Sequence, residues 1–306
     1  GHCRGGGYIR SAWHYAPRLA MPSMESSSAS GMSGQPHTQL VVSPERLRVI
    51  AYVCFSMLVA VGVVLTTLFA DVVPEETVIY SVYGYNNICI NFDYPPATYV
   101  VPTMWCVFLV PWIGYILTFW LRAGVRRDEG RLSALAYRAM SVFSFFEVAC
   151  ALYFIQVFVS KPYDSSDPIF GLAMHQHPFT IFIVSIFTMS LKCVWYFWST
   201  GKLNATQKVT HFVFIVLLFG MTLAKVTTEI NAIAGGPIWV PNSPTATAVG
   251  GLADKVWTVL ATIVPALVTY FVELPGADAF HISLVLAPSG EYTSRLPLSK
   301  SREVLA

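Results

Sequence analysis

Ionisable side chains are rare inside the apolar stretches of this 306-residue chain, so the few that occur stand out chemically. Glu147 lies in the middle of the stretch SVFSFFEVACALYF and has no charged neighbour one helical turn away. A lone carboxylate in an apolar helix has to be protonated, face a polar cavity or pair with another helix. Two interpretations stay open for it: contact with a lipid headgroup or an ion, and a structural hydrogen bond between helices.

Two lysines lie in other apolar stretches. Lys192, within TMSLKCVWYFW, can extend its long stem toward the membrane interface, and we favour this snorkelling over a direct pair with Glu147. Lys225 and Glu229 are four residues apart on one helix face, so we expect them to pair with each other.

Three histidines and one aspartate stand at the expected ends of apolar stretches. His175 and His177 form an HxH pair, but no Cys or second acidic cluster lies nearby to complete a metal site, so we expect interfacial hydrogen bonding instead. His211 is expected to anchor the fifth stretch at the interface, and Asp254 to cap the sixth. Haem would need histidines on paired helices within the membrane, so neither haem, a metal nor another cofactor is expected.

The composition indicates a membrane protein. Hydrophobic residues make up 55% of the chain and charged residues only 12%, against about 25% in an average soluble domain. A formal net charge of +2 offers no basic face for nucleic acid. The six Cys are scattered without a CxxC motif, which excludes a disulfide scaffold or a zinc site. No GxSxG, HExxH or Walker-type motif occurs, so we assign no catalytic residues and favour a non-enzymatic role.

Six apolar stretches are long enough to cross a bilayer core of about 30 Å as helices. They are residues 48–70, 99–121, 134–159, 178–198, 209–232 and 252–272. Strands of a membrane barrel would instead alternate in segments of about ten residues. The sequence therefore predicts an all-α bundle of six transmembrane helices, residues 44–274, between a disordered or processed segment 1–43 and a C-terminal tail 275–306.

The basic residues predict the orientation, because Lys and Arg favour the cytosolic side. They gather in four segments that alternate with the helices: Arg46 and Arg48; Arg122, Arg126, Arg127 and Arg131; Lys202 and Lys208; Arg295, Lys300 and Arg302. The other three loops hold only one basic residue, Lys161. Both termini are therefore expected in the cytosol, with the long loop 71–98 on the opposite side.

Three short segments carry a resemblance to a known family. They are HQHPFTIFIVS from His175, LAYR with FFEVACAL around Glu147, and NFDYPPATY around Asp93. In this order they resemble the fourth span, the third span with its acidic residue, and the approach to the second span in the Frag/DRAM/Sfk family, which includes post-GPI-attachment-to-proteins factors. The resemblance covers roughly residues 44–274.

The resemblance implies a protein of the endoplasmic reticulum or Golgi that supports lipid remodelling of GPI anchors or the organisation of membrane lipids. Its partners would be membrane lipids, with GPI-anchored proteins or other membrane subunits. Glu147, His175 and Asp93 are the positions carried over, and His177 and Lys192 complete the candidate lipid or polar-cleft residues. In this picture His175 and Asp93 lie near the headgroups and Glu147 lines a cleft between helices.

Two other classes of function stay open. An Arg-bearing leader with no acid before Glu25, together with many aromatic residues, is typical of an accessory subunit in an energy-transducing complex of the mitochondrial inner membrane or a plastid membrane. A channel or transporter would need a polar pore or inverted repeats. Glu147, Lys225 and Glu229 are too few to define a pore.

Overall fold

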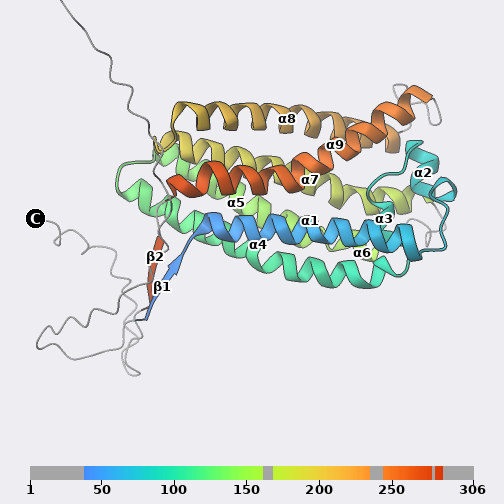
Figure 1. Cartoon of the computed structure of the whole chain (residues 1–306), viewed down its shortest axis with the longest axis horizontal. Coiled ribbons are helices and arrows are strands. Elements are labelled where there is room, and N and C mark those ends of the chain that lie inside the picture. Colours follow the sequence, from blue (N-terminus) through green and yellow to red (C-terminus); the bar gives the residue numbers. More distant parts are fainter. Residues whose placement is uncertain (1–37, 161–167, 235–243, 278–279, 285–306) are drawn as a thin grey trace, which may run out of the picture. The chain divides into compact units, whose positions relative to one another are not determined.

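A computed structural model describes residues 38–160, 168–234, 244–277 and 280–284, and all statements about structure refer to these residues. Most of the expected segment 1–43 and of the tail 275–306 lies outside them, as does Lys161. Residues 39–284 form one compact unit. Six helices in it are long and apolar enough to cross a membrane, which confirms the predicted all-α six-span bundle (Figure 1).

The spanning helices alternate with short connecting elements. The long helices are α1 (Pro44–Phe69), α4 (Ala97–Asp128), α5 (Ala134–Tyr153) continued by α6 (Gln156–Val159), α7 (Pro168–Ser199), α8 (Ala205–Ala234) and α9 (Pro244–Val268). The shorter elements are η1 (Pro74–Glu76), α2 (Val78–Tyr83), α3 (Ile90–Asp93), the π-helix η3 (Thr269–Glu273) and η4 (Leu274–Gly276). Strands β1 (Thr38–Val42) and β2 (Phe280–Leu284), from the two expected terminal segments, pair in a two-stranded sheet.

Two helices, α7 and α9, begin much earlier than the sequence predicts. Pro178 was expected to open the fourth span, but α7 begins at Pro168 and Pro178 lies inside it. An internal Pro is tolerated in a membrane helix because neighbouring groups satisfy the freed carbonyl. His175 and His177 consequently lie within α7 and not in a loop. In the same way α9 begins at Pro244, so Asp254 lies inside that helix and does not cap it.

The two ends of the bundle differ in chemistry. At the basic end (residues 122–133 and 200–204), the connections 129–133 and 200–204 reverse the chain, helped by Gly130 and Gly201 with φ of 72° and 68°. The opposite end is formed largely by η1, α2 and α3, and we call residues 70–96 the loop end.

Helix α1 packs against α4 and α9, while α7 packs against α5 and α8.

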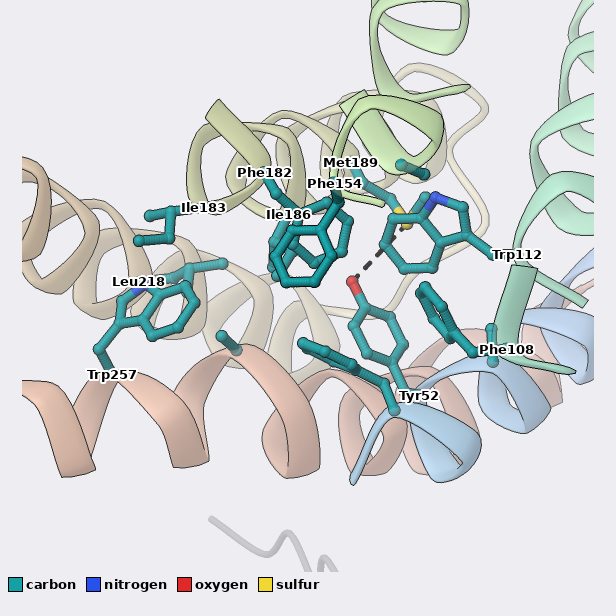
Figure 2. Close-up of a cluster of buried hydrophobic side chains, with 14 of the residues drawn as sticks. Tyr52, Phe108, Trp112, Phe154, Phe182, Ile183, Ile186, Met189, Leu218 and Trp257 are labelled. Atoms are coloured by element: carbon teal, nitrogen blue, oxygen red, sulfur yellow. Dashed lines mark hydrogen bonds between the residues drawn. The ribbon is translucent and has the colours of Figure 1, made fainter. Parts of the chain in front are cut away.

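Aromatic side chains fill the interior between the ends. Trp105 stacks on Phe154 with ring centroids 4.1 Å apart, and Phe182 meets both edge-on or tilted. Tyr52 packs edge-on against Trp112 and donates a hydrogen bond to the sulfur of Met189, 3.7 Å away (Figure 2). We call these six residues the aromatic core. Such a core fixes how the helices are rotated against one another, and with it which polar side chains meet.

Candidate functional site

Glu147 of α5 and Lys192 of α7 form a fully buried ion pair. Lys192 Nζ also donates to Ser144 Oγ at 3.0 Å and lies 4.9 Å from the ring centroid of Phe119. The expectation that Lys192 snorkels to the interface is therefore wrong. The Glu147 carboxylate faces Lys192 across the contact between α5 and α7. Burial of either charge without its partner would cost far more free energy than burial of the ion pair.

Ser144 separates this ion pair from a groove between α4 and α5. The groove has a volume of about 290 Å³ and is lined by Ile116, Leu117, Trp120, Ser141, Ser144, Phe145 and Val148. Its rim belongs to the outer flank of the bundle, since Phe145 is 79% exposed and Leu117 49% exposed. Inside it Trp120 Nε1 donates to Ser141 Oγ at 3.0 Å. Glu147 was expected to line a cleft, but it sits behind the wall and Ser144 lines the groove.

The groove residues were not predicted from the sequence, although the sequence contains a signal for them. Ser141, Ser144 and Glu147 follow one another at intervals of three residues, so they share one face of α5. Two hydroxyls and a carboxylate along one face of an apolar helix indicate a polar strip that has to meet a partner.

A second buried cluster of charges lies toward the loop end. Lys225 Nζ is 3.0 Å from Glu229 Oε1, as their spacing predicts, and also pairs with Asp254 of α9. Thr180 donates to Glu229 at 2.7 Å, and the backbone N–H of Ile88 donates to Asp254 at 3.0 Å. The expected capping role of Asp254 is wrong, because its carboxylate holds the loop end onto α8 and α9.

His175 and Asp93 are brought together beneath the loop end. His175 Nδ1 lies 2.8 Å from the carbonyl oxygen of Ser160, and since a carbonyl only accepts, that nitrogen donates. Its Nε2 lies 3.6 Å from Asp93 Oδ2, and both side chains are almost fully buried. They are therefore not open to headgroups, contrary to the expected picture. His177 is exposed and its Nδ1 lies 3.1 Å from the hydroxyl of Tyr153.

The candidate residues thus form separate clusters. Along α7, His175 comes first, then Phe182 and Met189 of the aromatic core, and then Lys192. On α7 the aromatic-core residues Phe182 and Met189 therefore lie between His175, which pairs with Asp93, and Lys192, which pairs with Glu147. No group of three or more His, Cys, Asp or Glu in the described part of the chain is placed to hold a metal ion.

A further ionic group near the basic end was not singled out from the sequence. Arg48 donates to both carboxylate oxygens of Glu273, at 2.6 and 2.9 Å. His211 Nε2 is 3.3 Å from Glu273 and the imidazole is buried, so the expected interface anchor is wrong. Arg122 pairs with Glu45 at 2.5 Å. These charged residues lie at the ends of apolar stretches. In the sequence, a charge at such a position indicates membrane orientation, and its ion-pair partner cannot be identified.

Outside the spanning segments, two groups show the electrostatics of the bundle ends. At the loop end, burial raises the pKa of the Cys89 thiol well above its usual range, so this free cysteine stays protonated and is a poor nucleophile. At the basic end, partial burial and the nearby Arg126 lower the pKa of Lys202.

Comparisons with protein-family models, with curated proteins and with solved structures found no match to this chain.

Proposed function

We propose that this protein is a non-catalytic, lipid-handling membrane protein that binds a lipid in the groove between α4 and α5. The observation that carries the proposal is an apolar groove of about 290 Å³ on the outer flank of two spanning helices, with Ser144 in its wall. Lipid tails surround such a flank in a bilayer, so a lipid is the natural occupant of a hollow there. Ser144 Oγ accepts a hydrogen bond from Lys192 Nζ. The hydroxyl proton of Ser144 is therefore available to donate to a carbonyl or hydroxyl of a lipid.

In this proposal the protein acts in the endoplasmic reticulum or Golgi and supports lipid remodelling of GPI anchors or membrane-lipid organisation. The resemblance of the segments around Glu147, His175 and Asp93 supports this setting. Glu147 and Lys192 then act behind the groove wall, where they hold Ser144 in position.

A crosslinking experiment tests lipid binding in the groove. The full-length chain, purified in detergent, is irradiated with a phospholipid that carries a diazirine in its acyl chain, and modified peptides are mapped by mass spectrometry. Leu117→Trp fills the mouth of the groove, and the matched control Val142→Trp adds the same ring at an exposed site of α5 outside the lining. We expect labelling of α4 and α5 to fall several-fold with Leu117→Trp alone. Labelling spread evenly over all exposed helix flanks would contradict the proposal.

A cellular experiment tests the finer assignment. A C-terminally tagged chain is localised, its mature N-terminus is read by mass spectrometry, and the lipid moieties of GPI-anchored proteins are compared in cells with and without the chain. We expect signal in the endoplasmic reticulum or Golgi and altered anchor lipids in its absence. Signal in mitochondria or plastids, with cleavage before Pro44, would sink this assignment and favour the accessory subunit of an energy-transducing complex.

A further inference from the structure

A second cavity lies at the loop end, between α9 and the chain that follows α1. It has a volume of about 400 Å³, within the range of sites that hold small molecules. Its wall includes Glu75, Tyr80, Tyr85, Asn86, Gly251 and Lys255. None of these residues lines the groove between α4 and α5.

The cavity presents one negative and one positive side chain. Glu75 and Lys255 are both exposed, and neither forms an ion pair with another residue that the structure describes. The buried charges nearby behave differently, since Lys225 is shared between Glu229 and Asp254. Glu75 and Lys255 are therefore the charges of this cavity that a ligand can reach.

Tyrosines supply the apolar part of the wall. Tyr85 is only 3% exposed and packs against Tyr83 with ring centroids 5.7 Å apart. Helix α9 passes beside Tyr85 at Gly251, where a Cβ would make an ordinary contact, 3.5 Å from Tyr85 Cβ. Burial raises the pKa of Tyr85, so its ring remains a neutral phenol. Tyr80, which is partly exposed, lines the same cavity as Glu75, and aromatic rings together with a carboxylate attract an organic ammonium group.

We propose that this cavity binds a zwitterionic headgroup, in which a phosphate ester and an alkylammonium are joined by a short linker. Glu75 and the partly exposed Tyr80 receive the ammonium group, and Lys255 receives the phosphate. A simple anion would pair with Lys255 and leave Glu75 unpaired, and a simple cation would pair with Glu75 and leave Lys255 unpaired, so neither satisfies both charges of the cavity. The proposal is independent of a lipid in the α4/α5 groove.

Two sources could supply this chemistry: a phospholipid of the adjoining leaflet, or a soluble phosphate ester. The first is near at hand, because η1 begins at Pro74, shortly after the spanning helix α1 ends at Phe69. The experiment therefore measures both with the same protein.

Binding is measured by microscale thermophoresis on the full-length chain in detergent. The probes are dihexanoyl phosphatidylcholine, dihexanoyl phosphatidylethanolamine, dihexanoyl phosphatidylglycerol and soluble phosphocholine. We expect the two zwitterionic lipids to bind at least about tenfold more tightly than the anionic lipid, which lacks the ammonium group. Glu75→Gln and Lys255→Met should each weaken their binding by about tenfold. Glu76→Gln and Lys208→Met, exposed residues outside the lining, are the matched controls and should leave the affinity unchanged.

The outcomes separate the possibilities. Binding of phosphocholine as tight as that of the lipids supports the zwitterion site and identifies a soluble ester as its ligand, whereas tight binding of the lipids alone identifies the membrane as the source. Equal affinity for phosphatidylglycerol, or a loss with Lys255→Met but not with Glu75→Gln, overturns the proposal in favour of a plain anion site. All four substitutions are at exposed positions, and an unchanged Tm without ligand verifies folding.

Discussion

Buried intramembrane charges in the described part of this protein form ion pairs, both between helices and within one helix. Glu147 meets Lys192, Lys225 meets both Glu229 and Asp254, and each of these groups is buried. Pairs of this kind add little to stability compared with apolar side chains of the same volume, but removal of one partner leaves the other as an uncompensated charge. Their stability effects are therefore strongly non-additive.

Lys192→Met should lower the free energy of unfolding by about 3–5 kcal/mol, because it leaves the Glu147 carboxylate without its cation. The double substitution of Lys192→Met with Glu147→Leu should recover most of that loss. Chemical unfolding of the purified protein in detergent checks both values. A Lys192→Met loss no larger than that of the exposed control Lys208→Met, expected within about 0.5 kcal/mol of zero, would contradict the buried pair.

Cys89 should resist alkylation in the folded protein. Its thiol is buried and its pKa is raised, so the reactive thiolate is scarce at pH 7 and becomes more populated only as the pH rises. Mass spectrometry after treatment with N-ethylmaleimide at pH 7 should find Cys89 unmodified in detergent and modified after unfolding in SDS. Rapid modification in the folded state would show that the loop end opens readily.

At the scale of elements, a close approach of α3 to α1 positions the buried Asp93. Thr66 of α1 donates to the carbonyl of Asn91 at 3.3 Å, and Gly62 leaves room for this contact. A Cβ at Gly62 would lie 3.0 Å from Asn91 O and 3.0 Å from Phe92 Cε1. A glycine that would weaken a helix elsewhere thus allows α3 to lie against α1.

Gly62→Ala should therefore destabilise the protein by about 1–3 kcal/mol, because overpacking at the α1–α3 contact exceeds the gain in helix propensity. Gly220→Ala in α8 is the matched control. A Cβ there has no heavy atom within 4 Å, so we expect no loss and a gain of up to about 1 kcal/mol. The shifts in Tm of the two variants give the comparison, and an equal response of both glycines would argue against the close approach.

At the scale of the whole molecule, the alternation of basic and basic-poor loops implies one orientation in the membrane. The six spans leave the connection 129–133 and the loop end on opposite faces of the bundle. Because Lys and Arg favour the cytosol, we expect the connection 129–133 there and the loop end on the other side. The cavity with Glu75 and Lys255 would then face the non-cytosolic side.

Labelling of sealed membrane vesicles of known orientation with an impermeant maleimide tests this topology. Ser81→Cys at the loop end and Arg131→Cys at the basic end are both exposed positions. In vesicles with the cytosolic face outward, Arg131→Cys should be labelled at once and Ser81→Cys only after the membrane is permeabilised. The reverse pattern would invert the topology and move both proposed sites to the opposite leaflets.

The fold class could be predicted because the bilayer constrains it so strongly. Backbone groups in lipid have to be satisfied within each span, so length and hydropathy alone indicated six helices. The i, i+4 pair of Lys225 and Glu229 followed from helix geometry for the same local reason. Helix starts were less certain, since Pro178 and Asp254 carry the signals of a first turn and yet lie inside their helices.

Contacts between helices could not be predicted, because periodicity defines the face of a helix and not its neighbour or its rotation. Glu147 pairs with Lys192, and Asp254 with Lys225, only at particular rotations of the helices about their axes. Packing of the aromatic core fixes these rotations. The groove lined by Ser144 and the cavity lined by Glu75 and Lys255 depend in turn on where the packed helices leave space. Local chemistry thus determined which segments are helices, and long-range packing determined which of their polar groups meet.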